Sequence, residues 1–293
     1  MSLGIKKSER ELSIGEIISE SFNLYSARFV DFLIPYLFAA LVTGVFSMAV
    51  YQMLLMPMPP IPEPTAPPEE LLRWLGGVFL PWLANLIAVA ILVGFVSWIV
   101  NTIVSGIAIK YASDLLEKGD ASLQVGFNFT VSRLVSLLTV GIITGFLIIL
   151  GLICLIVPGI IISIMFALVT PVIIIERVGA LDSLGKSRRL VSRRWGKTFA
   201  VLLLVSIIIG IATSMASVIV RPLGPVGSIV SSLITALIQP VFPIALTFLY
   251  YSMVAKEAPA PTAPSKYCPH CGRQIPLDSR FCPHCGKEID SPL

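Results

Sequence analysis

Long apolar runs separated by short polar segments dominate the hydrophobic pattern of the chain. A helix needs about 20 mostly apolar residues to cross a hydrocarbon core of roughly 30 Å. The pattern therefore predicts an all-α polytopic membrane bundle, with about six transmembrane helices in a domain spanning residues 29–256. The predicted spans are residues 29–55, 81–109, 134–157, 160–175, 198–220 and 228–253.

Pro158 and Gly159 separate the third apolar run from the fourth. Both residue types end helices and permit the chain to reverse, so they predict a tight helical hairpin. A single kinked helix is the alternative. Its roughly 40 residues would be much longer than one bilayer requires.

A short pattern recurs before pairs of predicted spans. Residues 21–29 and 187–195 share the order Ser-x-x-Leu-x-Ser-x-Arg followed by an aromatic residue, and residues 126–134 hold a weaker copy. Apolar residues also recur at helical spacing within residues 14–25, after a Ser13-x-x-Glu16 capping box. These patterns predict three units, each a cytoplasmic amphipathic helix followed by two membrane helices. The first amphipathic helix falls in residues 1–28. Chance similarity in a biased composition is the alternative.

Charged residues are scarce and unevenly placed. Of the 293 residues, 56% are hydrophobic and 13% are charged, about half the charged fraction of a soluble domain. All 21 lysines and arginines except Arg73 and Arg221 fall in the N-terminal segment, the second-to-third connection, the fourth-to-fifth connection or the C-terminal tail. Because Lys and Arg favour cytoplasmic loops, we expect a multi-pass cell-membrane protein with both termini in the cytoplasm. The polar start of the chain predicts no cleavable signal peptide.

Four of the five cysteines lie in two C-P-H-C-G knuckles near the C-terminus. Two residues between paired cysteines let both thiolates face one ion, and four thiolates complete a tetrahedral zinc shell. Residues 267–289 are therefore predicted to form a zinc ribbon around one structural Zn²⁺ per chain. Its ligands would be Cys268, Cys271, Cys282 and Cys285. Disulfides are the alternative, and a reducing cytosol disfavours them.

The ribbon is predicted to be a docking module. About 23 residues cannot bury a sufficient core, so zinc binding would supply its folding free energy. A filled shell leaves no open position for a substrate. The Pro/Ala-rich linker of residues 257–266 is expected to act as a semi-rigid spacer. Basic and acidic residues alternate in the ribbon without forming a basic face, so no nucleic-acid partner is expected.

Arginines at the ends of the predicted amphipathic helices are candidates for contact with lipid headgroups. A guanidinium group pairs with phosphate, and a neighbouring aromatic ring suits the membrane interface. The lipid bilayer is thus an expected partner of these side chains. The candidates are Arg28, Arg188, Arg189, Arg193 and Arg194.

Several motifs resemble a known membrane domain. They are Pro158-Gly159, the stretch 171–181, the segment 187–195, and the opening stretch 15–25. Together they are similar to the membrane domain associated with bacterial glycerophosphoryl diester phosphodiesterases, and to uncharacterised polytopic relatives. The resemblance covers about residues 12–254. It implies a membrane bundle but no reaction, because the phosphodiesterase activity of that family lies in a separate TIM-barrel domain.

No catalytic constellation is evident in the sequence. The predicted spans hold few polar residues, chiefly Asn85, Asn101 and Gln239, and both histidines lie in the ribbon. We therefore expect a non-enzymatic membrane scaffold or regulator whose cytosolic ribbon docks a partner protein. The alternative is a transporter or lipid-handling protein with a path between helical repeats. A membrane enzyme acting on lipid headgroups would need an acid such as Glu176 or Asp182 beside a basic pocket.

Overall fold

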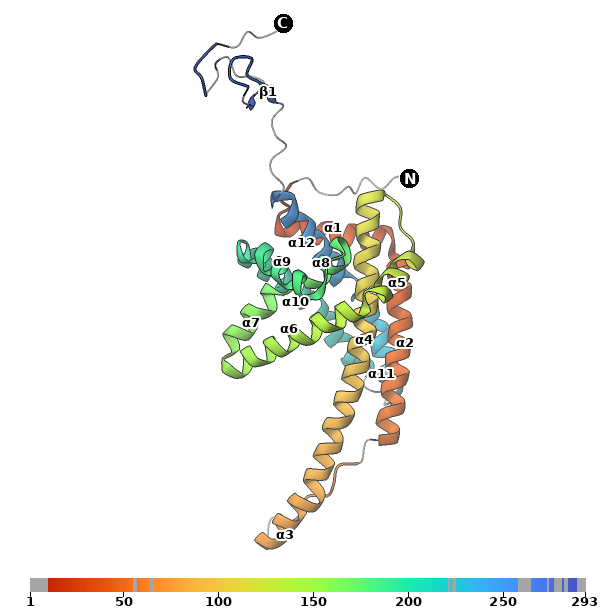
Figure 1. Ribbon diagram of the computed structural model, residues 1–293. Coiled ribbons are helices and arrows are strands. Elements are labelled where there is room, and N and C mark those ends of the chain that lie inside the picture. The colour runs from red at the N-terminus through yellow and green to blue at the C-terminus, as the bar shows by residue number, and fades with distance from the viewer. Residues whose placement is uncertain are drawn as a thin grey trace.

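The computed structural model describes residues 10–54, 57–63, 66–220, 222, 225–257, 265–272, 274–276, 281 and 284–288. These residues are almost entirely helical, with two short strands towards the C-terminal end (Figure 1). The helices are α1 (Ile14–Ala27), α2 (Phe29–Leu54), α3 (Pro68–Trp74), the π-helical turn η1 (Leu75–Phe79), α4 (Leu80–Lys118), α5 (Leu123–Ser132), α6 (Leu134–Cys154), α7 (Ile156–Met165), α8 (Val169–Glu176), α9 (Ala180–Ser192), α10 (Trp195–Val220), α11 (Pro225–Ala236) and α12 (Val241–Glu257).

Six helical segments of the described residues are long and apolar enough to cross a membrane. This confirms the predicted fold class, an all-α bundle with about six membrane spans and a C-terminal zinc-ribbon region. The segments are Phe29–Leu54, Pro68–Lys118, Leu134–Cys154, Ile156–Glu176, Trp195–Val220 and Ile229–Ala255.

The second span is longer than its apolar run predicted, because the helix begins at Pro68 instead of residue 81. Helices α3 and α4 are joined without a break by the π-helical turn η1. Pro81 lies in the first turn of α4, where its missing N–H group is tolerated. The wider turn before it lets the helix continue where a proline usually marks a start.

The break between the third and fourth spans lies at Leu155, so the predicted turn at Pro158-Gly159 is wrong. Leu155 is extended (φ −167°, ψ 148°) between α6 and α7. Pro158 sits in the first turn of α7, a position that suits its ring. Gly159 packs against Gly151, where a Cβ on Gly151 would lie 2.9 Å from the Gly159 Cα. The proline and glycine thus begin a helix and permit close packing.

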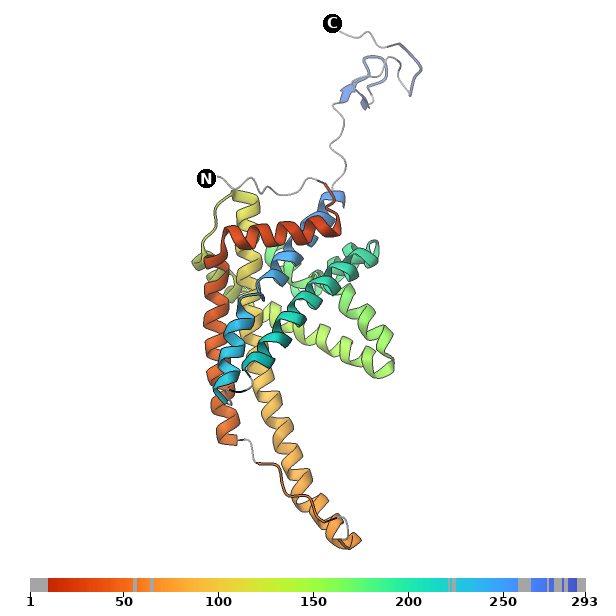
Figure 2. The same ribbon diagram turned by 180° about the vertical axis from the view of Figure 1, so that it is seen from behind.

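Helices α1, α5 and α9 each precede two membrane-crossing segments, in the order that the sequence pattern predicted. The matching serines Ser21 and Ser187 are both fully buried, and so are Leu24 and Leu190. The shared pattern therefore marks the faces that pack on the bundle. Figure 2 shows α1 lying crosswise over the end of the bundle where α12 finishes.

The start of α1 is fixed by local and long-range contacts. The Glu16 amide donates to the Ser13 hydroxyl (3.3 Å) and the Ser13 amide donates to the Glu16 carboxylate (2.7 Å), which confirms the capping box. Arg10 also donates to Glu16, and this hydrogen bond, followed by that from the Ser13 amide, lowers the pKa of Glu16 to about 2. The Leu12 amide donates to Ser252 of α12 (2.9 Å).

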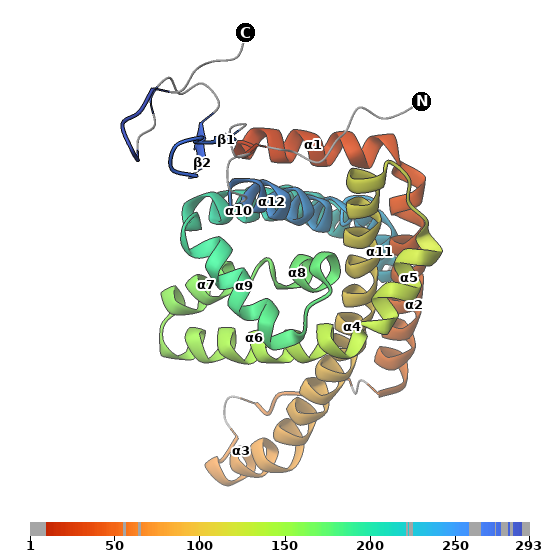
Figure 3. The ribbon, with the colours of Figure 1, turned by 45° about the horizontal axis from the view of Figure 1, so that its top comes forward.

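Helix α12 is the central element of the core. Its residues Ile244, Leu249 and Met253 are fully buried, and it contacts α1, α4, α8 and α10. Figure 3 shows it enclosed by these helices at the end of the bundle that carries α1. The last membrane-crossing segment is therefore the one that holds the others together.

The division of the chain into residues 1–28, 29–256, 257–266 and 267–289 stays a prediction. Residues 1–9 and 258–264 lie outside the described part of the chain.

Candidate metal centre and charged layer

The C-terminal ribbon is built on a short antiparallel pair of strands. Strand β1 (Ser265–Tyr267) pairs with β2 (Gln274–Pro276), and Lys266 lies opposite Ile275. A single bridge between Phe281 and Glu288 repeats this arrangement around the second knuckle. Each pairing brackets one C-P-H-C-G sequence.

Three cysteine sulfurs converge between these loops. The Sγ atoms of Cys268, Cys271 and Cys285 all lie within 4.8 Å of one another. Cys268 is buried, and its Sγ lies 3.8 Å from that of Cys285. Thiolates bound to one zinc ion at about 2.3 Å in a tetrahedron lie about 3.8 Å apart. The cluster therefore fits a zinc ion, while a disulfide would need sulfurs at about 2.05 Å.

The knuckle glycines adopt the backbone that this geometry requires. Gly272 has φ +69° and Gly286 has φ +71°. The Gly272 amide donates a hydrogen bond to the Cys268 carbonyl oxygen at 2.9 Å. This left-handed conformation favours glycine because a Cβ would be strained there. The chain thus turns back sharply after the second cysteine of each knuckle.

The other predicted ribbon residues are placed as follows. His270 and His284 are exposed and are not members of the cysteine cluster. Cys282 lies outside the described residues, so the four-cysteine ligand set stays a prediction. Among the described cysteines, Cys154 lies away from this site at the end of α6.

Comparison with known proteins identifies the C-terminal segment. A family model for the zinc-ribbon domain matches residues 267–289. No protein of curated function and no solved structure matches the chain. The similarity of residues 12–254 to the phosphodiesterase-associated membrane domain gains no support from these comparisons. The fold and the cysteine cluster together define a multi-pass membrane protein with a zinc-binding C-terminal ribbon.

The arginines predicted to contact lipid headgroups fall into two groups. Arg188, Arg189 and Arg193 are exposed along and after α9, and their contact with lipid stays a prediction. Arg194 instead points into the protein, with a side chain only 14% exposed. It pairs with Glu11 (3.5 Å) and donates to the Met253 carbonyl oxygen (3.0 Å). Arg28 pairs with Asp31 at 3.8 Å.

A layer of paired charges, which the sequence analysis missed, lies at the end of the bundle that carries α1, α5 and α9. We call it the charged layer; its members are Glu11, Lys110, Asp114, Glu117, Glu176, Lys186, Arg194 and Lys197. Lys110 and Asp114 are its most buried pair, with side chains 8% and 5% exposed and atoms 2.7 Å apart. Lys118 also contacts Asp114 at 2.7 Å, and Lys110 lies over the Phe129 ring of α5.

Two tyrosines of α12 extend the charged layer across the bundle. Tyr250 donates to Glu176 of α8, which also pairs with Lys186 of α9. Tyr251 donates to Glu117 of α4 at 2.7 Å. Adjacent residues of the central helix thus contact two different membrane helices through carboxylates.

Lys197, at the start of α10, connects two further segments, the residues before α1 and helix α12. Its Nζ donates to the Leu12 carbonyl oxygen, to Glu11 (3.1 Å) and to Ser252 (3.1 Å). The side chain is 15% exposed. Such a lysine acts as a structural link, because all of these acceptors belong to the protein itself.

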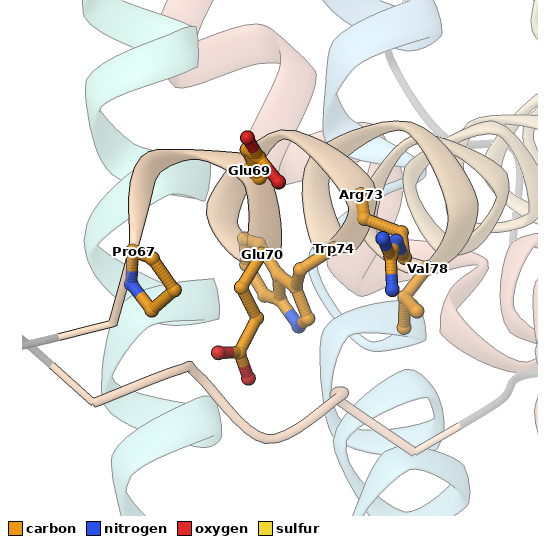
Figure 4. Close-up of a pocket in the computed structure, with 6 residues that line it drawn as sticks. All are labelled: Pro67, Glu69, Glu70, Arg73, Trp74 and Val78. Carbon is orange, nitrogen blue, oxygen red and sulfur yellow. The ribbon is translucent and has the colours of Figure 1, made fainter.

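A hollow of about 490 Å³ lies around α3 (Figure 4), which Figure 1 shows at the end of the molecule away from α1. Glu69, Glu70, Arg73 and Trp74 line it, and the Trp74 indole donates to the Pro60 carbonyl oxygen at 2.9 Å. This contact holds the proline-rich loop against the helix. The polar residues predicted within the spans are not among the residues that line this hollow. Asn101 donates to the Ser97 carbonyl oxygen of its own helix.

Proposed function

We propose that this protein is a membrane scaffold or regulator, without catalysis of its own, whose zinc ribbon docks a partner protein. The observation that carries the proposal is the convergence of Cys268, Cys271 and Cys285 on one point. With Cys282 as the fourth ligand, one Zn²⁺ per chain would have a filled shell. A filled shell supports structure and leaves no site for a substrate or an activated water.

The charged layer supports a structural role for the polar groups of the bundle. Glu11, Asp114 and Glu176 each pair with at least one lysine or arginine. A catalytic acid or base needs access to a substrate, whereas Asp114 is held by two lysines of its own helix, and Glu11 and Glu176 contact neighbouring helices. Glu176, an acid considered for lipid-headgroup chemistry, is held by Lys186 and Tyr250.

The proposed location is the cell membrane with both ends in the cytoplasm. The distribution of lysine and arginine supports this orientation. Helix α12 ends at the same end of the bundle as α1, so Glu257, its last residue, lies on the side of the charged layer. The cysteine thiols of the ribbon would then stay reduced in the cytosol, where soluble partner proteins are also present.

Zinc-dependent photo-crosslinking of the full chain in native membranes tests this proposal. A photo-reactive amino acid would replace Phe281, which is 58% exposed on the ribbon. The Cys268→Ser variant removes a buried ligand, and His270→Ser is the matched control in the same knuckle. Zinc per chain would be measured on the same purified samples.

The expected result is one zinc per chain and one discrete crosslinked protein for the unaltered ribbon and for His270→Ser. Cys268→Ser should lose both while the bundle stays folded, since the core clusters of the bundle contain none of the ribbon residues that the structure describes. An equally strong adduct in Cys268→Ser, or no adduct with a zinc-loaded ribbon, would rule out zinc-dependent docking.

A further inference from the structure

An apolar groove runs along the seam between α2 and α4 and is bordered by α5 at its charged-layer end. Its cavity measures about 490 Å³, and Gln124 is the one polar residue among those that line it. Pro35 and Ala39 line it on α2, Ile107 lines it on α4, and Phe127 lines it on α5. The small Ala39 side chain leaves space that a larger residue would fill.

The open side of the groove faces the surrounding lipid. Phe38 at its rim is 70% exposed, and Val42 is 40% exposed, within a segment long and apolar enough to cross a membrane. A buried water needs two to four polar partners, which this lining does not offer. The occupant must therefore be an apolar chain that arrives from the bilayer.

Polar groups stand at the charged-layer end of the groove. Asp31 lies one turn before Ile34 and Pro35 on the same face of α2, and accepts a hydrogen bond from Tyr111 of α4 at 2.6 Å. Pro35 has no N–H group to donate to the Asp31 carbonyl oxygen, which leaves that acceptor available. Arg28 lies 3.8 Å from Asp31, and the two side chains are 39% and 37% exposed.

The dimensions match one lipid leaflet. From Asp31 to Val42 the helix rises about 16 Å at 1.5 Å per residue. Half of a hydrocarbon core of about 30 Å is nearly the same length. A lipid chain in the groove would therefore place its headgroup beside Arg28 and Asp31.

We propose that the groove between α2 and α4 binds one phospholipid with an amine-bearing zwitterionic headgroup. One acyl chain lies along Phe38, Val42 and Ile107, Arg28 contacts the phosphate, and Asp31 contacts the ammonium group. This inference is independent of the ribbon and of its docking partner.

Native mass spectrometry of the full chain from nanodiscs tests the site. The nanodiscs would contain equal amounts of phosphatidylethanolamine and phosphatidylglycerol. Val42→Trp fills the groove, and Leu41→Trp is the control, because Leu41 is 48% exposed to lipid but does not line the groove. Unfolding midpoints of both variants would be compared with that of the wild type.

Wild type and Leu41→Trp should retain one phosphatidylethanolamine, and Val42→Trp should lower its occupancy about tenfold, the effect of a steric cost near 1.4 kcal/mol. Arg28→Gln should reduce retention without changing the fold. Equal retention by the two tryptophan variants would overturn the groove as the site. Preferential retention of phosphatidylglycerol would overturn the assigned headgroup.

A second measurement uses the wild-type chain and does not depend on the folding of a variant. A phosphatidylethanolamine with a photo-reactive acyl chain should crosslink Phe38, Ile103 or Phe127 in preference to Leu41. Labelling spread evenly over all lipid-facing residues of α2 would show a non-specific lipid shell and overturn the proposal.

Discussion

The two ends of α4 are built in opposite ways. From Val104 to Leu116 almost every residue is buried, including Lys110 and Asp114. Before Val104, Val89 is the one residue of α4 that is buried. The same helix therefore carries paired charges where other helices enclose it, and its lipid-facing part before Val104 contains only uncharged residues. Charge in this bundle follows the availability of protein partners.

The length of the exposed half of the second span also explains why aromatic residues occur at its start. The chain from Trp74 to Ile109 contains no charged residue, and as a helix it is about 54 Å long. That exceeds a hydrocarbon core of about 30 Å, so part of the segment must tilt or lie in the interface. The rings of Trp74 and Phe79 stack at 5.3 Å, where an interfacial aromatic belt is expected.

Asp114→Asn should give the strongest loss of stability, because it leaves the buried Lys110 ammonium group without its carboxylate. We expect a destabilisation of about 3–5 kcal/mol, measured by reversible unfolding in bicelles. The control substitution Leu72→Asn lies in α3, which continues the exposed end of the same long helical segment. It should change stability by less than about 0.5 kcal/mol, since Leu72 is 68% exposed. Similar losses for both variants would remove the contrast between the two ends.

Lys197→Met should detach the segment before α1. The substitution removes the donor to the Leu12 carbonyl oxygen and to Ser252, and hydrogen bonds from a charged donor contribute about 1.5–3 kcal/mol. Hydrogen exchange of residues 12–17 should accelerate accordingly. Arg193→Met, an exposed control at the end of α9, should leave their exchange unchanged.

Glu176 and Lys186 should show a smaller coupling, because Lys186 is 38% exposed. A double-mutant cycle with Glu176→Gln and Lys186→Met should give a coupling of about 1 kcal/mol. A coupling of zero would mean that this pair does not hold α8 to α9.

The capping box of α1 should show the smallest effect and a defined pH dependence. The pKa of Glu16 is lowered to about 2 in the folded protein from an ordinary value of 4.5, so its stabilising effect is complete above pH 4.5. The effect should decline as the pH falls from 4.5 towards 2. The stability difference between wild type and Glu16→Gln should thus be constant from pH 7 to 5. A stability difference that is already smaller at pH 6 than at pH 7 would contradict the lowered pKa of Glu16.

The spans and the ribbon could be predicted because their signals are local. A run of apolar residues or a pair of cysteines two residues apart carries its structural meaning within a few turns of chain. The capping box at Ser13 and the positive φ of Gly272 and Gly286 follow from short motifs in the same way.

The charged layer could not be predicted because its contacts join distant segments. Tyr250 and Glu176 are 74 residues apart, and Lys197 and Glu11 are 186 apart. Lys110 and Asp114 offered a partial signal, since opposite charges four residues apart share a helix face. The apolar run ends at Ile109, so the hydrophobic pattern places both residues in a connection instead of at the buried end of α4.

The orientation of the bundle across the membrane can be measured directly with inserted epitopes. One epitope would follow Gly119, beside the charged layer, and the other would lie in the proline-rich loop at residues 57–63. The account predicts that antibody reaches the loop epitope on intact cells and the Gly119 epitope only after the membrane is permeabilised. The reverse pattern would place the charged layer and the ribbon outside the cell and contradict cytosolic docking.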